Sequence, residues 1–216
     1  MRSDLVFHAL YRRFPQVERR FYLSSGIHED ETAGPLAIRA LLQQDDFHDD
    51  AECWLLPCLN PTGFAKNRRE NVAGIDLNRD YRKPKSEEFR AHLAWPKDKR
   101  RLNCAVCLHE GWEAQGFYLY AVTPQAFDWV SGSIIAAVSR VFPIEASNGT
   151  EGFPALWRNY SPASESNGLS GVPESLYLAQ HHCGLGYTLE TSSDFPLDVR
   201  VNALAAEVRA VWASVA

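Results

Sequence analysis

The sequence lacks the features that mark a membrane protein. None of its apolar runs approaches the roughly 18 residues of a membrane-spanning helix. The N-terminal segment also lacks the uninterrupted apolar stretch of a signal peptide. Its apolar residues Leu5, Val6, Leu10 and Phe14 instead suit an amphipathic helix, which we expect over residues 3–13. We therefore predict a protein with no membrane segment and no membrane partner.

An excess of positive charge is also missing. Lysines and arginines number 22 against 27 aspartates and glutamates, which gives a formal net charge of −5. Short basic runs at residues 66–69 and 97–101 have acidic residues around them. Because binding to nucleic acid depends on neutralising its phosphates, this balance argues against a nucleic-acid partner.

Cysteines are few, and we find neither internal repeats nor a convincing linker. The 5 cysteines are odd in number and lie mostly within apolar runs, which is typical of reduced, buried thiols in a cytoplasmic protein. The spacing of Cys104 and Cys107 is compatible with a redox pair or with half of a structural zinc site. Residues three apart on a strand, however, point to opposite faces of the sheet. We expect two separate thiols. A length of 216 residues fits one domain, which we predict over residues 1–216.

Strand patterns alternate with helical patterns along the chain. Residues 17–25 alternate apolar and polar side chains, as in a half-buried strand, whereas residues 53–59 and 103–110 form the continuous apolar runs of buried strands. We expect strands at residues 17–25, 53–59, 103–110, 117–122 and 186–191, and helices at 33–42, 86–95, 124–141, 173–182 and 197–215. Thr32 is the expected N-cap of the helix at 33–42. Residues 64–84 and 145–171 have the composition of loops. This order predicts an α/β fold, with three layers (α/β/α) and a central mixed, mostly parallel sheet.

Polar side chains stand where four of these strands end. His28 follows the first strand, Asn60 the second, His109 ends the third and Glu190 ends the last. Ligands of open α/β sheets bind at the carboxyl ends of the strands, so four such residues predict a site. His28 and Glu31 are three residues apart, and this short spacing lets an imidazole and a carboxylate reach one metal ion.

The motifs together resemble those of the zinc metallocarboxypeptidase family. His28-Glu29-Asp30-Glu31 matches its His-x-x-Glu zinc motif, and residues 60–63 (Asn-Pro-Thr-Gly) resemble its Asn-Pro-Asp-Gly turn. Residues 69–81 match the pattern Arg-x-Asn-x-x-Gly-Val-Asp-Leu-Asn-Arg-Asn-Phe closely. His109 and residues 188–190 (Thr-Leu-Glu) follow in the family's order. The resemblance covers residues 24–191 and implies a carboxypeptidase-like fold.

The resemblance also implies the metal chemistry. His28, Glu31 and His109 would bind one zinc ion and leave a fourth position open for water. Asp76 would accept a hydrogen bond from the far nitrogen of His28 and so fix the tautomer of that ring. Glu190 would be the general base that takes a proton from the water and passes it to the leaving amine.

Further residues of the same motifs would bind the substrate. Arg69 would stabilise the developing oxyanion, with Arg68 as the competing residue because the double arginine leaves the register open by one. Asn78 and Arg79 would bind the free carboxylate of the substrate, since a guanidinium can pair with a carboxylate through two hydrogen bonds. Some members close a tyrosine over the substrate, for which Tyr177 and Tyr160 are the candidates.

Three functions are compatible with these residues. The first is a zinc-dependent hydrolase of an amide bond next to a free carboxylate, acting on a small peptide, for example one derived from murein. The second is a deacylase of N-acyl amino acids that resembles succinylglutamate desuccinylase or aspartoacylase. The third is a non-catalytic binding module, which the presence of every ligand and of the base argues against.

Two acidic residues depart from the family pattern or lie beside it. Glu29 stands where the family often has glycine, and we expect its side chain to face solvent. Glu110 follows His109 and should point to the opposite face of its strand, where it could support the metal site or bind an amino group of the substrate.

Overall fold

The structure is a computed structural model that describes residues 9–12, 18–47, 51–81, 84–94, 101–112, 114–122, 129–146, 158–159 and 171–215. Its strands are β1 (Leu10–Arg12), β2 (Arg20–Ser24), β3 (Glu52–Leu56), β4 (Cys104–Gly111), β5 (Tyr118–Val122), β6 (Arg158–Asn159) and β7 (Gly186–Ser192). Its helices are α1 (Ala33–Gln43), α2 (Pro61–Phe64), the 3-10 turn η1 (Leu77–Arg79), α3 (Glu87–Ala94), α4 (Trp129–Val138), α5 (Glu174–His181) and α6 (Leu197–Val215).

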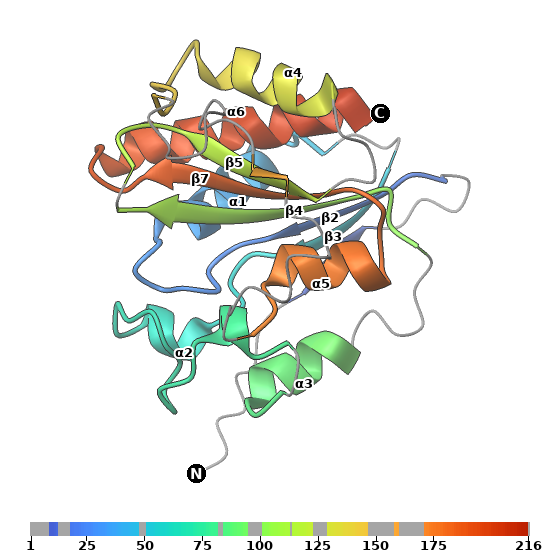
Figure 1. Ribbon diagram of the computed structural model, residues 1–216, viewed down its shortest axis with the longest axis vertical. Helices are drawn as coiled ribbons and strands as arrows, with labels where there is room; N and C mark the ends of the chain where they lie inside the picture. The colour runs from blue at the N-terminus through green and yellow to red at the C-terminus, as the bar shows by residue number, and fades with distance from the viewer. Residues whose placement is uncertain are drawn as a thin grey trace.

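The strands form one mixed sheet in the order β1-β3-β2-β4-β7-β5-β6. The four central strands β3, β2, β4 and β7 are parallel. At the edges, β1 is antiparallel to β3 and β5 is antiparallel to β7, whereas β6 is parallel to β5. Helices α1, α4 and α6 cover one face, and α5 covers the other, with α2 and α3 beyond it (Figure 1). The expected three-layer α/β/α fold with a mostly parallel central sheet is confirmed.

A hydrophobic core fills the space on each side of the sheet. Every residue of β3 is buried, and β4 is buried up to its last residue, as expected for strands covered on both faces. Cys104 packs in the core beneath α1 and α6, whereas Cys107 packs in the core on the α5 side. All 5 cysteines are free thiols. The expectation of two separate buried thiols at positions 104 and 107 is therefore confirmed.

The predicted helix at residues 3–13 is wrong for its last part. Residues 10–12 form β1, which pairs with the edge of β3, while residues 3–8 and 13 lie outside the described residues. The strand satisfies backbone groups of β3 that the helix would leave open, and this long-range pairing outweighs the local apolar pattern. The predicted loop at 64–84 contains η1. The predicted helix at 124–141 is described from residue 129 as α4, and residues 124–128 lie outside the described residues.

The side-chain cap predicted for Thr32 is also absent. Thr32 is the N-cap residue of α1, as expected, but its side chain makes no capping hydrogen bond. The backbone N–H of Ala33 donates instead to the Glu110 carboxylate at 2.7 Å. A carboxylate from a neighbouring strand therefore satisfies the start of the helix, a contact that no local signal predicts.

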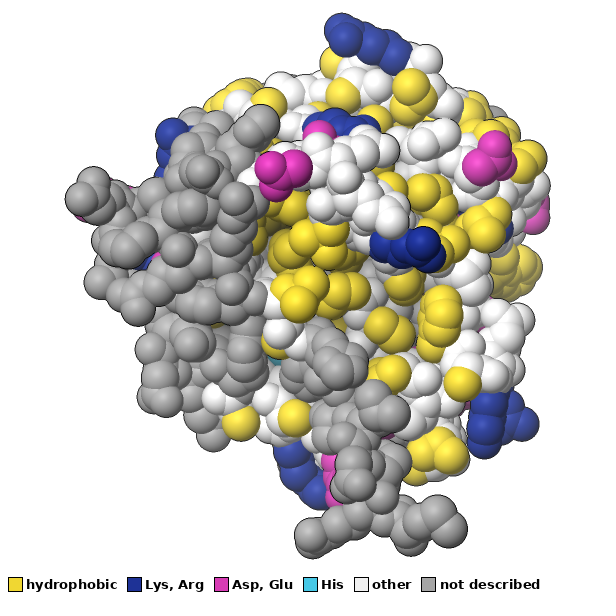
Figure 2. All heavy atoms as spheres, turned by 180° about the vertical axis from the view of Figure 1, so that it is seen from behind, with side chains coloured by type: hydrophobic (Ala, Val, Ile, Leu, Met, Phe, Trp, Pro, Cys, Tyr) yellow, Lys and Arg dark blue, Asp and Glu magenta, His cyan; other side chains and the backbone are white. Residues whose placement is uncertain are grey.

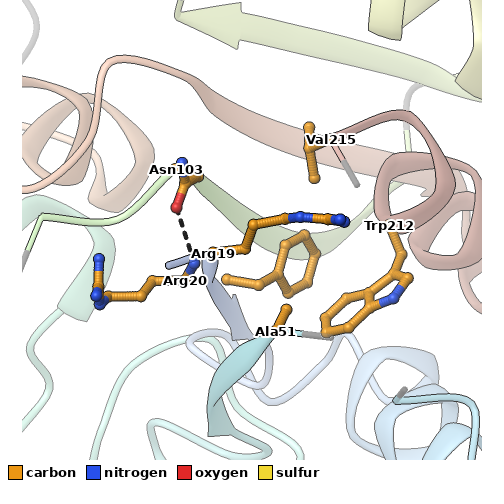
Figure 3. Close-up of a pocket in the computed structure, with 7 residues that line it drawn as sticks. Arg19, Arg20, Ala51, Asn103, Trp212 and Val215 are labelled. Carbon is orange, nitrogen blue, oxygen red and sulfur yellow. Dashed lines mark hydrogen bonds between the residues drawn. The ribbon is translucent and has the colours of Figure 1, made fainter. Parts of the chain in front are cut away.

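Two further features of the described surface lie away from the carboxyl ends of the strands. A cavity at the amino ends of β2 and β4, between Arg20, Asn103 and Trp212, measures about 10 Å³ and holds at most one water (Figure 3). On the face in Figure 2, lysine and arginine side chains are scattered among neutral and hydrophobic ones and form no positive patch.

Within the described part of the chain, no helix is both long and apolar enough to cross a bilayer.

Candidate metal-dependent active site

Three side chains that can bind a metal ion converge at the carboxyl ends of β2 and β4. His28 and Glu31 lie in the loop after β2, and His109 lies near the end of the adjacent parallel strand. The Glu31 carboxylate oxygens lie 2.6 Å from His28 Nδ1 and 2.8 Å from His109 Nδ1. One donor atom from each residue lies within 4.8 Å of the other two. The structure thus brings together all three predicted ligands.

The loop that carries His28 and Glu31 is held against the turn after β3. Gly26 has a positive φ of 60°, which favours glycine, and its carbonyl accepts a 2.9 Å hydrogen bond from Asn60 N. The Asn60 side chain in turn accepts a 3.2 Å hydrogen bond from Gly63 N. The Asn-Pro-Thr-Gly turn therefore supports the ligand loop rather than the metal itself.

Burial and mutual charge set the ionisation of these three groups. Burial alone would raise the pKa of Glu31, but the two histidines beside it hold this pKa well below its usual range. Burial alone would lower the pKa of His109, but Glu31 outweighs it and raises the pKa to about 9. His28 shows the same balance, and its pKa is raised. Glu31 is thus an ionised carboxylate that already attracts positive charge to this point.

The donor set fits a divalent metal ion. Two imidazole nitrogens and one carboxylate are the protein ligands of many catalytic zinc sites. All three residues are buried, so few waters compete for their donor atoms. The opening of the cleft beside them leaves space for a further ligand. The residues present therefore fit one ion with the ligand preferences of zinc.

Asp76 lies behind His28, as expected. Its Oδ1 is 3.3 Å from His28 Nε2 and also accepts a 2.9 Å hydrogen bond from Asn78 N, which starts η1. Burial raises the pKa of Asp76, but the contact with His28 outweighs it and lowers the pKa to about 2. The ionised Asp76 is therefore placed to orient the His28 ring, while the turn that carries Asn78 depends on the same carboxylate.

The structure distinguishes the two adjacent arginines. Arg69 lines the cleft, its Nε donates to Asp76 Oδ2 at 3.3 Å, and its Nη1 lies 3.7 Å from Glu31 Oε1. Arg68 is exposed and outside the cleft lining, and its backbone carbonyl accepts a hydrogen bond from Glu29 N. The structure thus places Arg69, and not Arg68, beside the predicted metal ligands, and the role of Arg69 at the oxyanion stays a prediction.

Glu190 lies in the cleft beside the three ligands. It is the register partner of His109 across β4 and β7, so both side chains project from the same face of the sheet. Burial raises the pKa of Glu190 to about 7, although His109 opposes this shift. A carboxyl group with a pKa near neutrality can both accept and release a proton, as its predicted role as general base requires.

Asn78 and Arg79 also line the cleft, where η1 places them beside the amino end of α5. The Arg79 Nη1 atom donates to the Asn78 carbonyl at 2.9 Å. The Asn78 side-chain oxygen accepts a 2.9 Å hydrogen bond from Glu174 N. Because this acceptor is occupied, the amide nitrogen is the end of Asn78 that can bind a carboxylate. The predicted role of both residues in anchoring a carboxylate stays a prediction.

A buried polar network that the sequence did not reveal supports this anchor. The Glu174 carboxylate accepts a 2.5 Å hydrogen bond from the Tyr22 hydroxyl, which also lies 2.9 Å from His92 Nε2. The Tyr81 hydroxyl lies 3.0 Å from His92 Nδ1. Burial raises the pKa of Glu174 and lowers that of His92 to about 3. The network fixes the start of α5, and with it the Glu174 N–H that holds Asn78.

The cleft has a volume of about 680 Å³, which is ample for a substituted amino acid. Its lining includes Tyr118 and Tyr120 of β5, Thr188 of β7, Ser175 of α5 and the exposed Trp112. None of these was a candidate from the sequence. The alternation of residues 117–122 does place both tyrosines on one face of a strand, but only the position of β5 beside β7 shows that this face is the cleft.

Of the two tyrosines expected to close over the substrate, Tyr177 is not among the described residues that line the cleft. Tyr177 stacks on Tyr81 with ring centroids 5.0 Å apart and lies 4.5 Å from the His181 ring. Tyr177 thus belongs to the packing of α5 against the buried network, which corrects its proposed role in substrate binding. Tyr160 lies outside the described residues.

The expectation that Glu29 faces solvent is wrong. Glu29 is fully buried, both of its carboxylate oxygens lack a hydrogen-bond partner, and its carboxyl group packs against the Cα of Gly63. Burial raises the pKa of Glu29 to about 9. The carboxylate of Glu110 is bound by Ala33 N and by Arg200 of α6. Glu110 therefore links α1 and α6, and both of its carboxylate oxygens already have partners, although the residue also borders the cleft.

Comparisons with known proteins agree with this geometry. Residues 17–190 match the model of the succinylglutamate desuccinylase/aspartoacylase catalytic domain. The chain belongs to this family. It is thereby a hydrolase of the superfamily that includes the metallocarboxypeptidases, as the sequence motifs implied. A comparison with curated proteins found no match.

Solved structures with the same fold come from bacterial proteins. A protein of Shewanella amazonensis assigned as a metallopeptidase is 25% identical, with a TM-score of 0.80 over 97% of this chain and 82% of that one. A similar protein of Shewanella denitrificans is 21% identical, with a TM-score of 0.81 over 99% and 81%. The metallo-carboxypeptidase of Pseudomonas aeruginosa is 18% identical, with a TM-score of 0.70 over 97% and 61%.

Proposed function

We propose that the protein is a zinc-dependent hydrolase that cleaves an amide bond next to a free carboxylate. The observation that carries this proposal is the convergence, in one cleft, of three metal ligands, a carboxyl group with a pKa near neutrality and two arginines. A binding module would not need Glu190 beside the ligands.

The residues divide the reaction between them. A zinc ion held by His28, Glu31 and His109 would act as a Lewis acid on the substrate carbonyl and make water more acidic. Glu190 accepts the proton of the attacking water and then delivers it to the leaving amine. Arg69 donates hydrogen bonds to the developing oxyanion, while Asp76 holds its Nε atom in place.

The substrate carboxylate is bound at the other end of this group of residues. Arg79 can pair with it through two hydrogen bonds, and the amide nitrogen of Asn78 can donate a third. Both side chains are oriented by backbone contacts before any ligand binds, through the Asn78 carbonyl and through Glu174 N. A neutral carboxamide forms weaker bonds with a guanidinium, so the site selects substrates with a free carboxylate.

The family favours N-acyl amino acids as the substrate class. A match to the catalytic domain of amino-acid deacylases covers most of the chain. We therefore rank N-acyl amino acids above small peptides as the substrate class. Small peptides, including those derived from murein, are the second candidate, because the neighbour in fold from Shewanella amazonensis is assigned as a metallopeptidase. We also propose a cytoplasmic location, in keeping with five free thiols.

A substrate panel tests the proposal. The zinc-loaded protein is incubated with N-acyl amino acids, γ-glutamyl peptides and murein-derived peptides, each as the free acid and as the carboxamide. Release of an amine from the free acids only is the expected result, and the most active class identifies the substrate. The matched variants Arg69→Ala and Arg68→Ala separate the two arginines, since only the first should reduce turnover, by roughly 2–4 kcal/mol of transition-state stabilisation. No hydrolysis of any member by the metal-loaded protein would overturn the proposal.

A further inference from the structure

Tyr118 places a phenol hydroxyl at the reacting end of the cleft. On β5 it is the register partner of Glu190, so its side chain projects from the same face of the sheet as that carboxyl group. Its ring reaches across β7 to β4, because a Cβ atom added to Gly111 would lie 2.5 Å from the Tyr118 hydroxyl oxygen. Gly111 stands two residues after His109 on β4. The hydroxyl therefore lies beyond Glu190, beside the end of the strand that supplies a metal ligand.

The arrangement of the cleft shows which half of the substrate reaches this hydroxyl. The carboxylate anchor adjoins the start of α5, where Ser175 accepts a 2.8 Å hydrogen bond from Thr188. Along β7, Thr188 precedes Glu190, and Tyr120 is the register partner of Thr188. With the substrate carboxylate bound at Asn78 and Arg79, as proposed above, the half that carries it would lie beside Thr188, and the acyl half would extend past Glu190 towards Gly111 and Tyr118.

The Tyr118 hydroxyl keeps its proton and can therefore donate a hydrogen bond. Burial, followed by the charges of Glu190, Tyr120 and Glu31 and a hydrogen bond to Glu190, raises the pKa of Tyr118 above its ordinary value. It therefore stays protonated at neutral pH, where Glu190 changes its ionisation. The glycine at 111 is the condition for this placement, because any larger residue would occupy the position of the hydroxyl.

We propose that Tyr118 is a further catalytic residue whose hydroxyl donates a hydrogen bond to the acyl side of the scissile amide as negative charge develops there. This inference rests on the proposed amide hydrolysis. Together with Arg69, Tyr118 would place hydrogen-bond donors on two sides of the reacting carbonyl, one from the loop before η1 and one from β5. A donor that acts on developing charge raises kcat more than it lowers KM.

The variant Tyr118→Phe tests this role and keeps the ring. We expect kcat on the best free-acid substrate to fall by about tenfold to a hundredfold, with KM changed by less than about threefold. Zinc content and thermal stability should match the parent protein. Tyr177→Phe is the matched control, because it removes a hydroxyl from a tyrosine outside the cleft lining, and its kcat should be unchanged.

Gly111 offers a second, independent variant. Gly111→Ala should displace the hydroxyl and reproduce the loss in kcat, whereas in the Tyr118→Phe background it should add little further loss. Affinity for a phosphonate analogue of the tetrahedral intermediate, measured by calorimetry, should fall in Tyr118→Phe by about the same factor as kcat. This affinity measurement does not depend on turnover.

The outcomes separate the two proposals. A parent protein that hydrolyses no amide overturns both of them. An active parent whose Tyr118→Phe variant retains kcat and analogue affinity within twofold overturns the role of Tyr118 alone. A rise in KM with kcat unchanged also overturns it, because the hydroxyl would then contribute only to binding of the ground state.

Discussion

The buried contact between Glu29 and Gly63 predicts a coupling between the metal loop and the turn after β3. A Cβ atom at position 63 would lie 2.2 Å from the Glu29 carboxyl carbon and 2.4 Å from one of its oxygens. Carbon atoms in contact are ordinarily about 3.5–4.0 Å apart, so Gly63→Ala must displace the buried Glu29 carboxyl group, or the segment that carries it, by roughly 1.5 Å. Overpacking of this kind costs about 1–3 kcal/mol of the free energy of unfolding.

The displacement should also reach the metal ligands. Glu29 stands between His28 and Glu31, and its backbone N–H is bound to the carbonyl of Arg68. Movement of Glu29 therefore shifts the loop that sets the spacing of two ligands. We expect Gly63→Ala to weaken zinc binding by about 10- to 100-fold, the loss typical of a disturbed support of metal ligands.

A double-mutant cycle measures the coupling. Glu29→Ala removes the colliding carboxyl group, so Gly63→Ala should cost less than about 0.5 kcal/mol in that background, with a coupling energy of about 1–3 kcal/mol. Urea denaturation followed by tryptophan fluorescence gives the stability, and competition with a chromophoric chelator gives the affinity for zinc. Gly132→Ala is the control, because its Cβ would meet nothing within 4 Å and should stabilise α4 by about 0.5–1 kcal/mol. Equal costs of Gly63→Ala with and without Glu29 would refute the reasoning.

Three further predictions concern the anchor, the base and the core. Arg79→Ala should raise KM by about tenfold to a hundredfold for free-acid substrates and leave carboxamides unaffected, and equal effects on both would exclude the anchor. Glu190 is protonated below its pKa of about 7, and a bound cation lowers this pKa further. We therefore expect kcat/KM to fall as the pH drops through a midpoint at or below about 7. A kcat/KM that rises towards acid pH would contradict the role of Glu190 as base. Glu207→Met should raise the free energy of unfolding by about 1–3 kcal/mol, because both buried Glu207 oxygens lack partners. Glu174→Met should lower it in the same urea assay, because Tyr22 loses its acceptor, and a loss at position 207 would show that Glu207 has a partner.

The layers of the fold and the metal ligands could be predicted from the sequence for a physical reason. Buried parallel strands read as continuous apolar runs, and their carboxyl ends meet at one edge of the sheet. Residues 53–59 and 103–110 show this pattern plainly. His28 follows a predicted strand, and His109 and Glu190 stand near the ends of two others, so their convergence depends only on the parallel order of the strands.

Other features depend on contacts between distant parts of the chain. Residues 10–12 follow a helical pattern, yet they pair with the edge of β3. The burial of Glu29 is set by Gly63 on another loop, and Tyr118 reaches the cleft only because β5 lies antiparallel to β7. No local period records such neighbours, which is why the sequence pointed to Tyr177 for a role that the structure does not support.

The central claim is that His28, Glu31 and His109 bind a catalytic zinc ion and that Glu190 is the base beside it. The most direct measurement compares the zinc content and the turnover of the parent protein with those of Glu190→Gln, on the best free-acid substrate. We predict one zinc ion per chain in both proteins and a loss of hydrolysis in the variant alone. Loss of zinc from Glu190→Gln would make Glu190 a ligand, and full turnover in that variant would exclude it as the base.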